Sequence, residues 1–467
     1  MADADLFDQP TPPHDPEPNS GELEESQVTI NFELAPGTRL KVTLDARAPD
    51  GTVIEQRDIT LENPSALPIK IVQEPIQLQK KPVFNSSHAG IRAAWPLILL
   101  AGVMLVYLAT RLIGLERFPI YFFTDEAIQT VTASDLIRDD FRNEFGEFLP
   151  AYFKNGGQYN LSLSVYLQVL PTLIFGKSVF VTRSVSVLIS LLAVLCVGFS
   201  LRYAFHSRSA WAGAMLLALT PAWFLHSRTA FETVLGVSFY AAFLYCYFRY
   251  RQGKHTYLYA GAGFAAAMFY SYSPGQIVQA ATVLLLFLSD IRYHWQQRKH
   301  LLRGLVLAVM LAIPYIQFQV NHPGETLRHL QILDSYWTQE ISSGEKILRF
   351  LQEYLRGLNP IYWYNPEPDG LSRHIMKGYS YLWLPGLPFT AIGLLTALKN
   401  YRKSAHRTVL AALLAAPTGA AMVSVGITRL LFMVVPAALL GGIGFGVSIE
   451  WLSQKFKDEK ARSRAFT

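Results

Sequence analysis

The chain has 467 residues, of which 51% are hydrophobic, 13% aromatic and only 16% charged. Soluble globular proteins carry about a quarter charged residues, so this deficit, with a mean hydropathy of +0.21, argues against a soluble protein and favours an integral membrane protein. The net charge of +6 is modest, and the basic residues cluster in short blocks between apolar stretches. This pattern is typical of membrane topology and argues against nucleic acid as a partner.

The first part of the chain has a different composition from the rest. Residues 1–26 are rich in Asp, Glu and Pro and contain no Lys or Arg, which is typical of a disordered acidic tail. Alternating apolar residues in "QVTINFEL", "RLKVTLDA" and "TVIEQRDITLE", with a turn at "PDG", predict strands between residues 27 and 75. We therefore expect a small β-rich cytoplasmic region over residues 27–92, whose role the sequence does not indicate.

From Trp95 onward the chain alternates between apolar stretches long enough to cross a bilayer and short polar connections. A spanning helix needs about 20 mostly apolar residues. The predicted spans are 94–114, 180–201, 209–226, 230–248, 256–273, 275–291, 302–319, 379–398, 408–425 and 429–450.

The connections provide an independent check on this count. The blocks "RYAFHSR", "RYRQGK", "RYHWQQRKHLLR", "KNYRKSAHR" and the tail "KFKDEKARSR" are strongly basic. With a cytoplasmic N-terminus, ten spans place every block inside, as the positive-inside rule requires. Counting the apolar segment 159–176 as another span would break this pattern, so we predict a re-entrant or interfacial helix there.

Under this topology, two long segments lie on the non-cytoplasmic face, residues 115–179 and 320–378. Long loops with aromatic and polar content usually carry function. The sequence shows no internal repeat, and its candidate ionisable residues stand at the ends of spans. A transporter would be expected to place such residues at mid-span or in paired broken helices, so both features favour an enzyme.

Two adjacent carboxylates, Asp125 and Glu126, stand in "RFPIYFFTDEAIQT", just beyond the first span. They are either a solvated pair at the start of a loop or a functional pair. Tyr121 and two phenylalanines precede them, so the pair is expected in an aromatic, partly dry setting. A carboxylate in such a setting is suited to act as a general base.

A third acid opens a later span, in "HSRTAFETV". Arg228 and Glu232 are spaced i,i+4 and are expected to share a helix face. They form either a local ion pair at the membrane edge or a functional pair of the active site. In the second case Arg228 contacts an anion and Glu232 faces the same cavity as Asp125. The presence of His226 at the same end favours this second interpretation.

Further cations and aromatic residues follow on the same face. Lys154 precedes Asn155 and a Gly-Gly turn, which can present an ammonium and backbone N–H groups to a phosphate. Arg373, His374 and Lys377 in "SRHIMKGY" form either a phosphate clamp or an interfacial cluster. Arg429 leads into the last span from the outer side, against the positive-inside trend, which favours an anion contact. The candidate substrate-lining residues are Tyr121, Asn155, Tyr159, Tyr270, Tyr272 and His374.

Carboxylates beside cations at a lipid boundary suit one task well, the transfer of a group from a lipid phosphate carrier to an acceptor. The cations hold the phosphate and stabilise it as a leaving group. One carboxylate takes the proton from the acceptor hydroxyl as that oxygen attacks the anomeric carbon of a sugar. The catalytic candidates are Asp125, Glu126 and Glu232, and the phosphate-binding candidates are Lys154, Arg228, Arg373 and Arg429.

The order and sidedness of these motifs resemble the GT-C superfamily of polyprenyl-phosphate-sugar glycosyltransferases. The closest resemblance is to protein O-mannosyltransferase-like members and to the bacterial transferases that add aminoarabinose to lipid A. "TDEA" resembles their acidic motif after the first span, which puts Asp125 at the position of the catalytic base. Lys154 and the segment 159–176 resemble their phosphate-contacting lysine and juxtamembrane helices. "SRTAFE", with Glu232, and "TRLLFMVVP", with Arg429, resemble two later motifs.

The chain departs from the lipid A enzymes at three motif positions. Asn155 stands where those enzymes have a proline after the lysine. Glu232 stands in place of their second aspartate. Leu430 follows Arg429, where the family has a tyrosine.

The resemblance implies an all-α polytopic GT-C-type helical bundle over residues 93–452, with outer-face juxtamembrane helices, and a basic cytoplasmic tail at 453–467. It implies an inverting glycosyltransferase of the cell (inner or plasma) membrane with its active site on the non-cytoplasmic face. The partners would be a polyprenyl-phosphate-linked sugar donor, a glycan, lipid or protein acceptor, and membrane lipids. No cofactor is firmly implied, although the acidic cluster would accommodate a divalent cation. The alternative is a transporter or flippase of a lipid-linked saccharide.

Overall fold

The computed structural model describes residues 39–47, 53–62 and 86–465, with side chains described over residues 95–456. The chain divides into two compact units, Met1–Val83 and Phe84–Thr467. The second unit contains all the candidate site residues.

In the first unit, β1 (Arg39–Arg47) and β2 (Val53–Glu62) form an antiparallel pair with Val42 opposite Ile59. These strands coincide with two of the three segments for which alternation predicts strands. The third segment, at 27–34, and the predicted turn at 49–51 lie outside the described residues, as does the acidic tail. A β-rich cytoplasmic region therefore stays a prediction.

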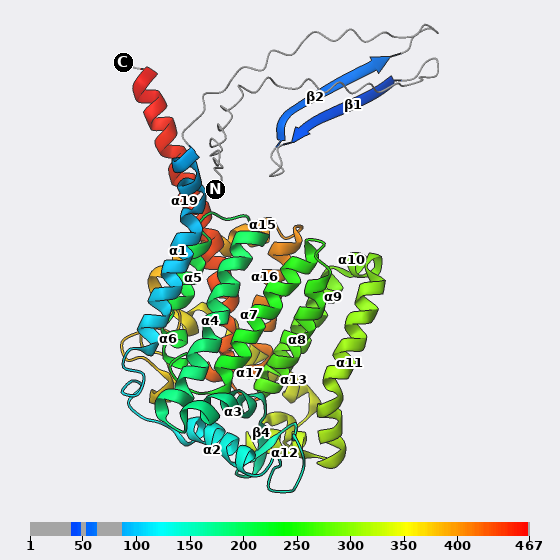
Figure 1. Ribbon diagram of the computed structural model, residues 1–467, viewed down its shortest axis with the longest axis vertical. Coiled ribbons are helices and arrows are strands. Elements are labelled where there is room, and N and C mark those ends of the chain that lie inside the picture. Colours follow the sequence, from blue (N-terminus) through cyan, green and yellow to red (C-terminus); the bar gives the residue numbers. More distant parts are fainter. Residues whose placement is uncertain (1–38, 48–52, 63–85, 466–467) are drawn as a thin grey trace, which may run out of the picture. The chain divides into compact units, whose positions relative to one another are not determined.

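The second unit is a bundle of helices whose axes are roughly aligned (Figure 1). Its apolar helices are α1 (Ser86–Leu112), α4 (Val179–Ala204), α5 (Ala210–Leu219), α6 (Pro221–His226), α7 (Glu232–Arg251), α8 (Thr256–Ser271), α9 (Ser273–Ser289), α11 (Arg298–Asn321), α15 (Leu387–Lys399), α16 (Ser404–Ala415), α17 (Thr418–Ala421), α18 (Ile427–Leu430) and α19 (Val434–Ala465). The short α10 (Ile291–Gln296) lies in a basic connection.

Four segments of the described chain are helical, apolar and long enough to cross a membrane: Trp95–Leu112, Val179–Ala204, Arg298–Asn321 and Ile427–Phe456. They coincide with four of the ten predicted spans. The other predicted spans contain helices that are shorter or, like the 20-residue α7, less apolar, so a total of ten crossings stays a prediction.

Two of the predicted spans are not single helices. The span at 209–226 is divided into α5 and α6 at Pro221, which starts α6 while Thr220 before it is extended. The span at 408–425 is divided into α16 and α17 at Pro417. Proline lacks the backbone N–H that continues a helix. It also disfavours helical angles for the residue before it, as seen at Thr220, whereas Ala416 before Pro417 keeps helical angles. In the span at 379–398 the helix begins only at Leu387, after a 3₁₀ turn at Leu384–Gly386 that contains a proline.

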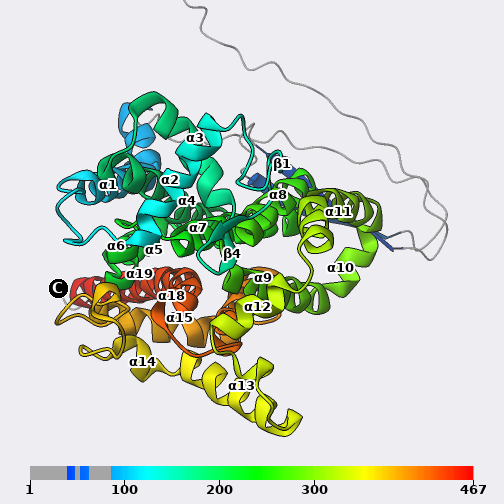
Figure 2. The same cartoon turned by 90° about the horizontal axis from the view of Figure 1, so that it is seen from below.

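The two long segments predicted for the outer face gather at one end of the bundle (Figure 1). The first contributes α2 (Thr124–Arg138), the hairpin of β3 (Phe153–Asn155) and β4 (Gln158–Leu161), and α3 (Leu163–Phe175). The second contributes α12 (Glu325–Ile332), α13 (Ser343–Leu358) and α14 (Pro360–Tyr364). Seen from this end, α2 and α3 lie over one side of the bundle and α13 and α14 over the other (Figure 2).

The helix α3 is the segment predicted to be re-entrant or interfacial. Its 13 residues extend about 20 Å, well short of the roughly 30 Å of a bilayer core. It packs against α2 and α4, so it covers the bundle end and does not form a further crossing.

Several helices of the bundle core pack closely against one another. α15 packs along α19, and α7 packs against α4 and α8. A Cβ atom at Gly393 would lie 1.8 Å from the carbonyl oxygen of Leu440, and one at Gly444 would lie 1.9 Å from that of Phe389. Only glycine allows the backbones of α15 and α19 to approach so closely.

Candidate active site

A fully buried ion pair anchors the end of the bundle at which the two long segments gather. Glu126, in the first turn of α2, and Arg183, the fifth residue of α4, both have 0% exposed side chains. Arg183 Nε donates to Glu126 Oε2 at 2.9 Å, and Nη2 donates to Oε1 at 3.0 Å. The Ala230 backbone N–H donates to the same carboxylate at 3.0 Å. Glu126 therefore joins α2, α4 and the start of α7.

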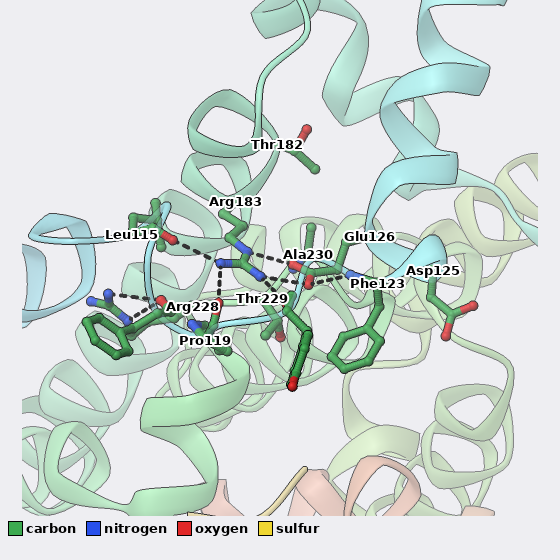
Figure 3. Close-up of polar contacts among 12 residues, drawn as sticks. Leu115, Pro119, Phe123, Asp125, Glu126, Thr182, Arg183, Arg228, Thr229 and Ala230 are labelled. Carbon is green, nitrogen blue, oxygen red and sulfur yellow. Dashed lines mark hydrogen bonds and ion pairs between the residues drawn. The ribbon is translucent and has the colours of Figure 1, made fainter. Parts of the chain in front are cut away.

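The remaining N–H groups of Arg183 hold the loop that leads to α2 (Figure 3). Nη1 donates to the carbonyl oxygens of Leu115 and Pro119 at 3.0 Å each, and Nη2 donates to that of Tyr121 at 2.7 Å. A paired arginine is the usual way to satisfy several buried carbonyl groups at a membrane edge. The ion pair of Glu126 and Arg183, with these carbonyl contacts, is called the clasp below.

The neighbouring acid, Asp125, is in the opposite situation. Its side chain is exposed and points away from the clasp (Figure 3). Within the described part of the chain, no hydrogen bond or ion pair engages its carboxylate. The clasp immobilises the residue beside it, so Asp125 has a fixed backbone and a free carboxylate, which is the arrangement that a general base needs.

Three other predicted residues lie in the same neighbourhood. The charge of Asp125 acts on Glu232, the first residue of α7, which is surrounded by protein yet keeps some accessible surface. The hydroxyl of Tyr272 lies beside Thr233, and the charges of Glu232 and Arg429 both act on it. The fold therefore brings Asp125, Glu232, Tyr272 and Arg429 together from four separate segments.

A cavity of about 1230 Å³ opens beside the loop that leads to α2. Its walls come from the end of α1, the loop that the clasp holds, α6, and the segment at 371–377 before α15. Most of the wall is apolar, and Tyr121 and Phe123 line it two to four residues before Asp125. The charged groups in the wall are Arg228, Arg373 and Lys377.

The guanidinium of Arg373 stands over the ring of Phe123, with 5.1 Å between Cζ and the ring centroid. Its Nε donates to His374 Nε2 at 3.1 Å. His374 is buried, and its ring stacks on that of His226 at a centroid distance of 5.3 Å. Arg373 and Lys377 are therefore the cations that this cavity offers to an anion.

A smaller cavity of about 120 Å³ lies between the β3–β4 hairpin and the ends of α9, α11 and α12. Tyr159 and Arg429 line it, together with His329 and Glu325 of α12. Burial lowers the pKa of His329 from its ordinary value, and the charge of Arg429 adds to this effect. Arg429 thus faces a different cavity from Arg373, although the sequence suggested one shared phosphate site.

The contacts of Arg228 do not support the predicted phosphate role. Its guanidinium donates to the carbonyl oxygens of Thr110, Arg111, Ile113 and Phe118. The prediction that Arg228 and Glu232 share a helix face is also wrong, because α7 begins at Glu232 and the preceding residue is extended. Arg228 closes the end of α1 onto the loop and has no N–H group left for a ligand.

The remaining predicted residues have local roles. Lys154 is exposed in β3 with its ammonium 5.5 Å from the ring centroid of Phe145, and it lines neither cavity. Asn155 pairs with Gln158 across the predicted Gly-Gly turn. Tyr270 donates to the Leu311 carbonyl oxygen at 2.8 Å and accepts from the Tyr315 N–H, so it joins α8 to α11.

A metal site finds no support within residues 95–456. No group of three or more His, Cys, Asp or Glu side chains is arranged to hold an ion there. Asp125 and Glu232 are near one another, but the third acid of the predicted cluster, Glu126, is occupied by Arg183.

Arg183 was not among the residues predicted from the sequence, whereas Lys377 was predicted only as part of a possible phosphate clamp. Arg183 stands in the apolar run "VFVTRSVSVLISLL", and an arginine inside a span is costly unless it is paired. This cost was a signal that a buried acid must lie nearby. For Lys377 the signal was its place beside Arg373 in "SRHIMKGY", and both residues line the large cavity.

The fold defines the class of protein. The chain is similar to the crystal structure of ArnT from Cupriavidus metallidurans bound to undecaprenyl phosphate, with a TM-score of 0.52 and 14% identity over 75% of this chain and 60% of that chain. It is also similar to the Archaeoglobus fulgidus oligosaccharyltransferase, with a TM-score of 0.52 and 15% identity over 76% of this chain and 49% of that chain. The chain is therefore a membrane protein with the GT-C fold.

A family model provides the second comparison. The model for dolichyl-phosphate-mannose-protein mannosyltransferases matches residues 163–318, from α3 to α11. No curated protein sequence matches the chain. The resemblance that the motifs suggested is confirmed. The chain spans about 60% of the length of ArnT.

Proposed function

We propose that this protein is an inverting membrane glycosyltransferase that moves a sugar from a polyprenyl-phosphate carrier to an acceptor hydroxyl. The observation that carries the proposal is the contrast between adjacent acids. Glu126 is locked in the clasp, whereas Asp125 beside it is exposed and stands two residues after Phe123, which lines a large apolar cavity with Arg373 and Lys377 in its wall. The family match and the fold support the same reaction class.

In the proposed reaction, the carboxylate of Asp125 takes the proton from the acceptor hydroxyl. The acceptor oxygen forms a bond to the anomeric carbon, the bond from that carbon to the phosphate oxygen breaks, and polyprenyl phosphate leaves with the electron pair. A single displacement of this kind inverts the anomeric carbon. Glu232 and Tyr272, near Asp125, would orient the acceptor.

Cations in the cavity wall would stabilise the leaving phosphate. Arg373 and Lys377 stand where an apolar cavity meets the polar outer end of the bundle. Fixed positive charge at a developing phosphate anion is often the largest contribution to lowering such a barrier. Arg429, which faces the smaller cavity, would contact the acceptor or the sugar, and Lys154 would act only if its hairpin moved.

The proposal includes a location. The site lies at the end of the bundle that the charge pattern assigns to the non-cytoplasmic face of the cell membrane. The acceptor is a glycan, lipid or protein that approaches from that side. Nothing in the contacts of the site favours one of these acceptors.

The test compares purified wild type with Asp125→Asn on a panel of radiolabelled polyprenyl-phosphate sugars, measuring the release of polyprenyl phosphate. We expect the substitution to lower turnover by about 100-fold or more, because a general base typically contributes 10²–10⁴-fold. The melting temperature should be unchanged, since the side chain is exposed and nearly isosteric.

Asp135→Asn is the matched control, because Asp135 lies in the same helix and pairs with Arg138 at the surface. It should leave turnover unchanged. Equal turnover by wild type and Asp125→Asn would overturn the assignment of the base. Movement of labelled lipid between liposome leaflets without turnover of any donor would replace the transferase with a flippase.

A further inference from the structure

Two stacked histidines lie directly behind the cation that faces the large cavity. The rings of His226, at the end of α6, and His374 are nearly parallel, with an interplanar angle of 10°. The ring of Phe231 meets His374 edge-on at a centroid distance of 5.3 Å. His374 is thus fixed by two rings that come from another part of the chain.

The hydrogen bonds decide the tautomer of each ring. His374 Nε2 accepts from Arg373 Nε at 3.1 Å, so the proton of a neutral His374 must be on Nδ1. His226 Nδ1 lies 2.7 Å from the Ala222 carbonyl oxygen and must donate to it. Both rings are therefore neutral with the proton on Nδ1, which avoids stacking two positive charges in a buried site.

The charge of the ring matters for Arg373. A protonated His374 would have no lone pair to offer and would repel the guanidinium. Burial, with the nearby His226 and Arg373, lowers the pKa of His374 to about 3. The imidazole therefore remains an acceptor for Arg373 throughout the ordinary pH range.

Arg373 is held from two sides, by the face of Phe123 and by the lone pair of His374. These contacts involve Cζ and Nε of the guanidinium. Within the described residues, neither terminal nitrogen has a hydrogen-bond partner. An arginine loses considerable side-chain freedom when it binds a ligand, and these contacts remove much of that freedom in advance.

We propose that His374 is a positioning residue, which fixes the guanidinium of Arg373 so that its terminal nitrogens meet the phosphate of a lipid-linked donor in the large cavity. His374 does not itself line the cavity, whereas Arg373 and Lys377 do. This differs from the direct substrate contact that the sequence suggested for His374. The inference rests on the proposed function, because it requires a lipid phosphate as ligand.

The test measures binding of undecaprenyl phosphate, and of the uncharged undecaprenol, to the purified full-length protein in detergent. His374→Phe keeps a ring between His226 and Phe231 but removes the acceptor. It should weaken binding of the phosphate about three- to tenfold, the expected cost of ordering one arginine side chain. Binding of undecaprenol should not change, although a general loss of structure would weaken both.

A rescue variant and a double variant complete the experiment. His374→Gln restores an acceptor oxygen close to the position of Nε2, so it should bind the phosphate nearly as well as wild type. Arg373→Ala should weaken binding of the phosphate tenfold or more. Adding His374→Phe to Arg373→Ala should cause no further loss, because the histidine acts only through the arginine.

The outcomes separate this inference from the proposed function. If wild type binds undecaprenyl phosphate no better than undecaprenol, the lipid-phosphate donor is wrong, and the inference is wrong with it. If wild type prefers the phosphate but His374→Phe equals wild type, or Gln behaves like Phe, then only the positioning role is overturned.

Discussion

Two buried carboxylates hold opposite ends of the bundle, and they are satisfied in different ways (Figure 1). Glu126, at the end that carries the site, pairs with Arg183 alone, and both side chains are 0% exposed. Asp290, at the end of α9, is 1% exposed and pairs with Arg251 and Arg407, which are 13% and 25% exposed. The hydroxyl of Tyr247 also donates to Asp290, at 2.8 Å.

The difference indicates what each pair does. Every N–H group of the Arg183 guanidinium donates to Glu126 or to a loop carbonyl oxygen. The clasp is therefore neutral and has no donor left for another partner. Around Asp290 two arginines share one acid, and Arg251 Nη1 and Arg407 Nε have no partner among the described residues. That cluster ties three basic connections together and retains a net positive charge. Only the clasp sets the geometry of a site.

The largest effect on stability should come from opening the clasp. Arg183→Met leaves Glu126 buried without a counter-charge, and we expect a loss of about 3–5 kcal/mol in the free energy of unfolding. The loop at 115–121 should also become accessible to protease, because its carbonyl oxygens lose their donors. Thermal unfolding in detergent and limited proteolysis measure the two effects.

Two variants serve as controls for this prediction. The double replacement Glu126→Gln with Arg183→Met removes both charges and should recover part of the lost stability. Arg138→Met, in a surface pair with Asp139, should leave unfolding unchanged. A single Arg183→Met variant as stable as wild type would show that the clasp is not the anchor described here.

A smaller effect is expected at the opposite end of the bundle. Asp290→Asn removes one buried charge, but both arginines reach solvent in part, so we expect a loss of about 1–3 kcal/mol. Donor turnover per folded molecule should stay at the wild-type value, because the cluster touches neither cavity wall through Asp290. A loss of turnover in fully folded Asp290→Asn would contradict the division of roles between the two ends.

The smallest effect concerns pH. The pKa of His374 is about 3 in the folded chain, against an ordinary value of 6.5. Between these values the unfolded chain binds more protons, so the free energy of unfolding falls as the pH is lowered below about 6.5. Above that pH the ring is neutral in both states and contributes no pH dependence.

The measurement is the melting temperature of wild type and His374→Phe from pH 7.5 to 4.5. Wild type should lose more stability than the variant over this interval. Parallel curves for the two proteins would mean that His374 is protonated in the folded state, and the hydrogen bond to Arg373 would then be wrong.

Much of the fold could be predicted because its signals are local. Hydropathy gave the position of the long helices α1, α4, α11 and α19, and charge in the connections predicted that α3 is not a further span. The breaks in α5–α6 and α16–α17 could have been predicted as well, since Pro221 and Pro417 stand inside the apolar runs. The close pairing of α15 and α19 depends on glycines from distant segments, and no local pattern shows it.

The site was only partly predictable, and the adjacent acids show why. In the sequence Asp125 and Glu126 are equivalent neighbours, and either could be the base. Successive residues on a helix point in directions about 100° apart, so the side chain of Glu126 enters the bundle and that of Asp125 stays exposed. Which of them is buried depends on where Arg183 lies, 57 residues further along the chain.

The sequence by itself determined that this protein crosses a membrane, which end of it collects the polar loops, and which residue types meet there, because hydropathy and charge act through local composition. The tertiary structure decided which of those residues are free to act. The guanidinium of Arg228 is occupied by backbone carbonyl groups, and the carboxylate of Glu126 is occupied by a buried ion pair. The side chain of Asp125 is exposed, and Arg373 lines the large cavity. Such partners come from distant segments, since a buried charge must be matched wherever the fold brings an opposite charge or a dipole to it.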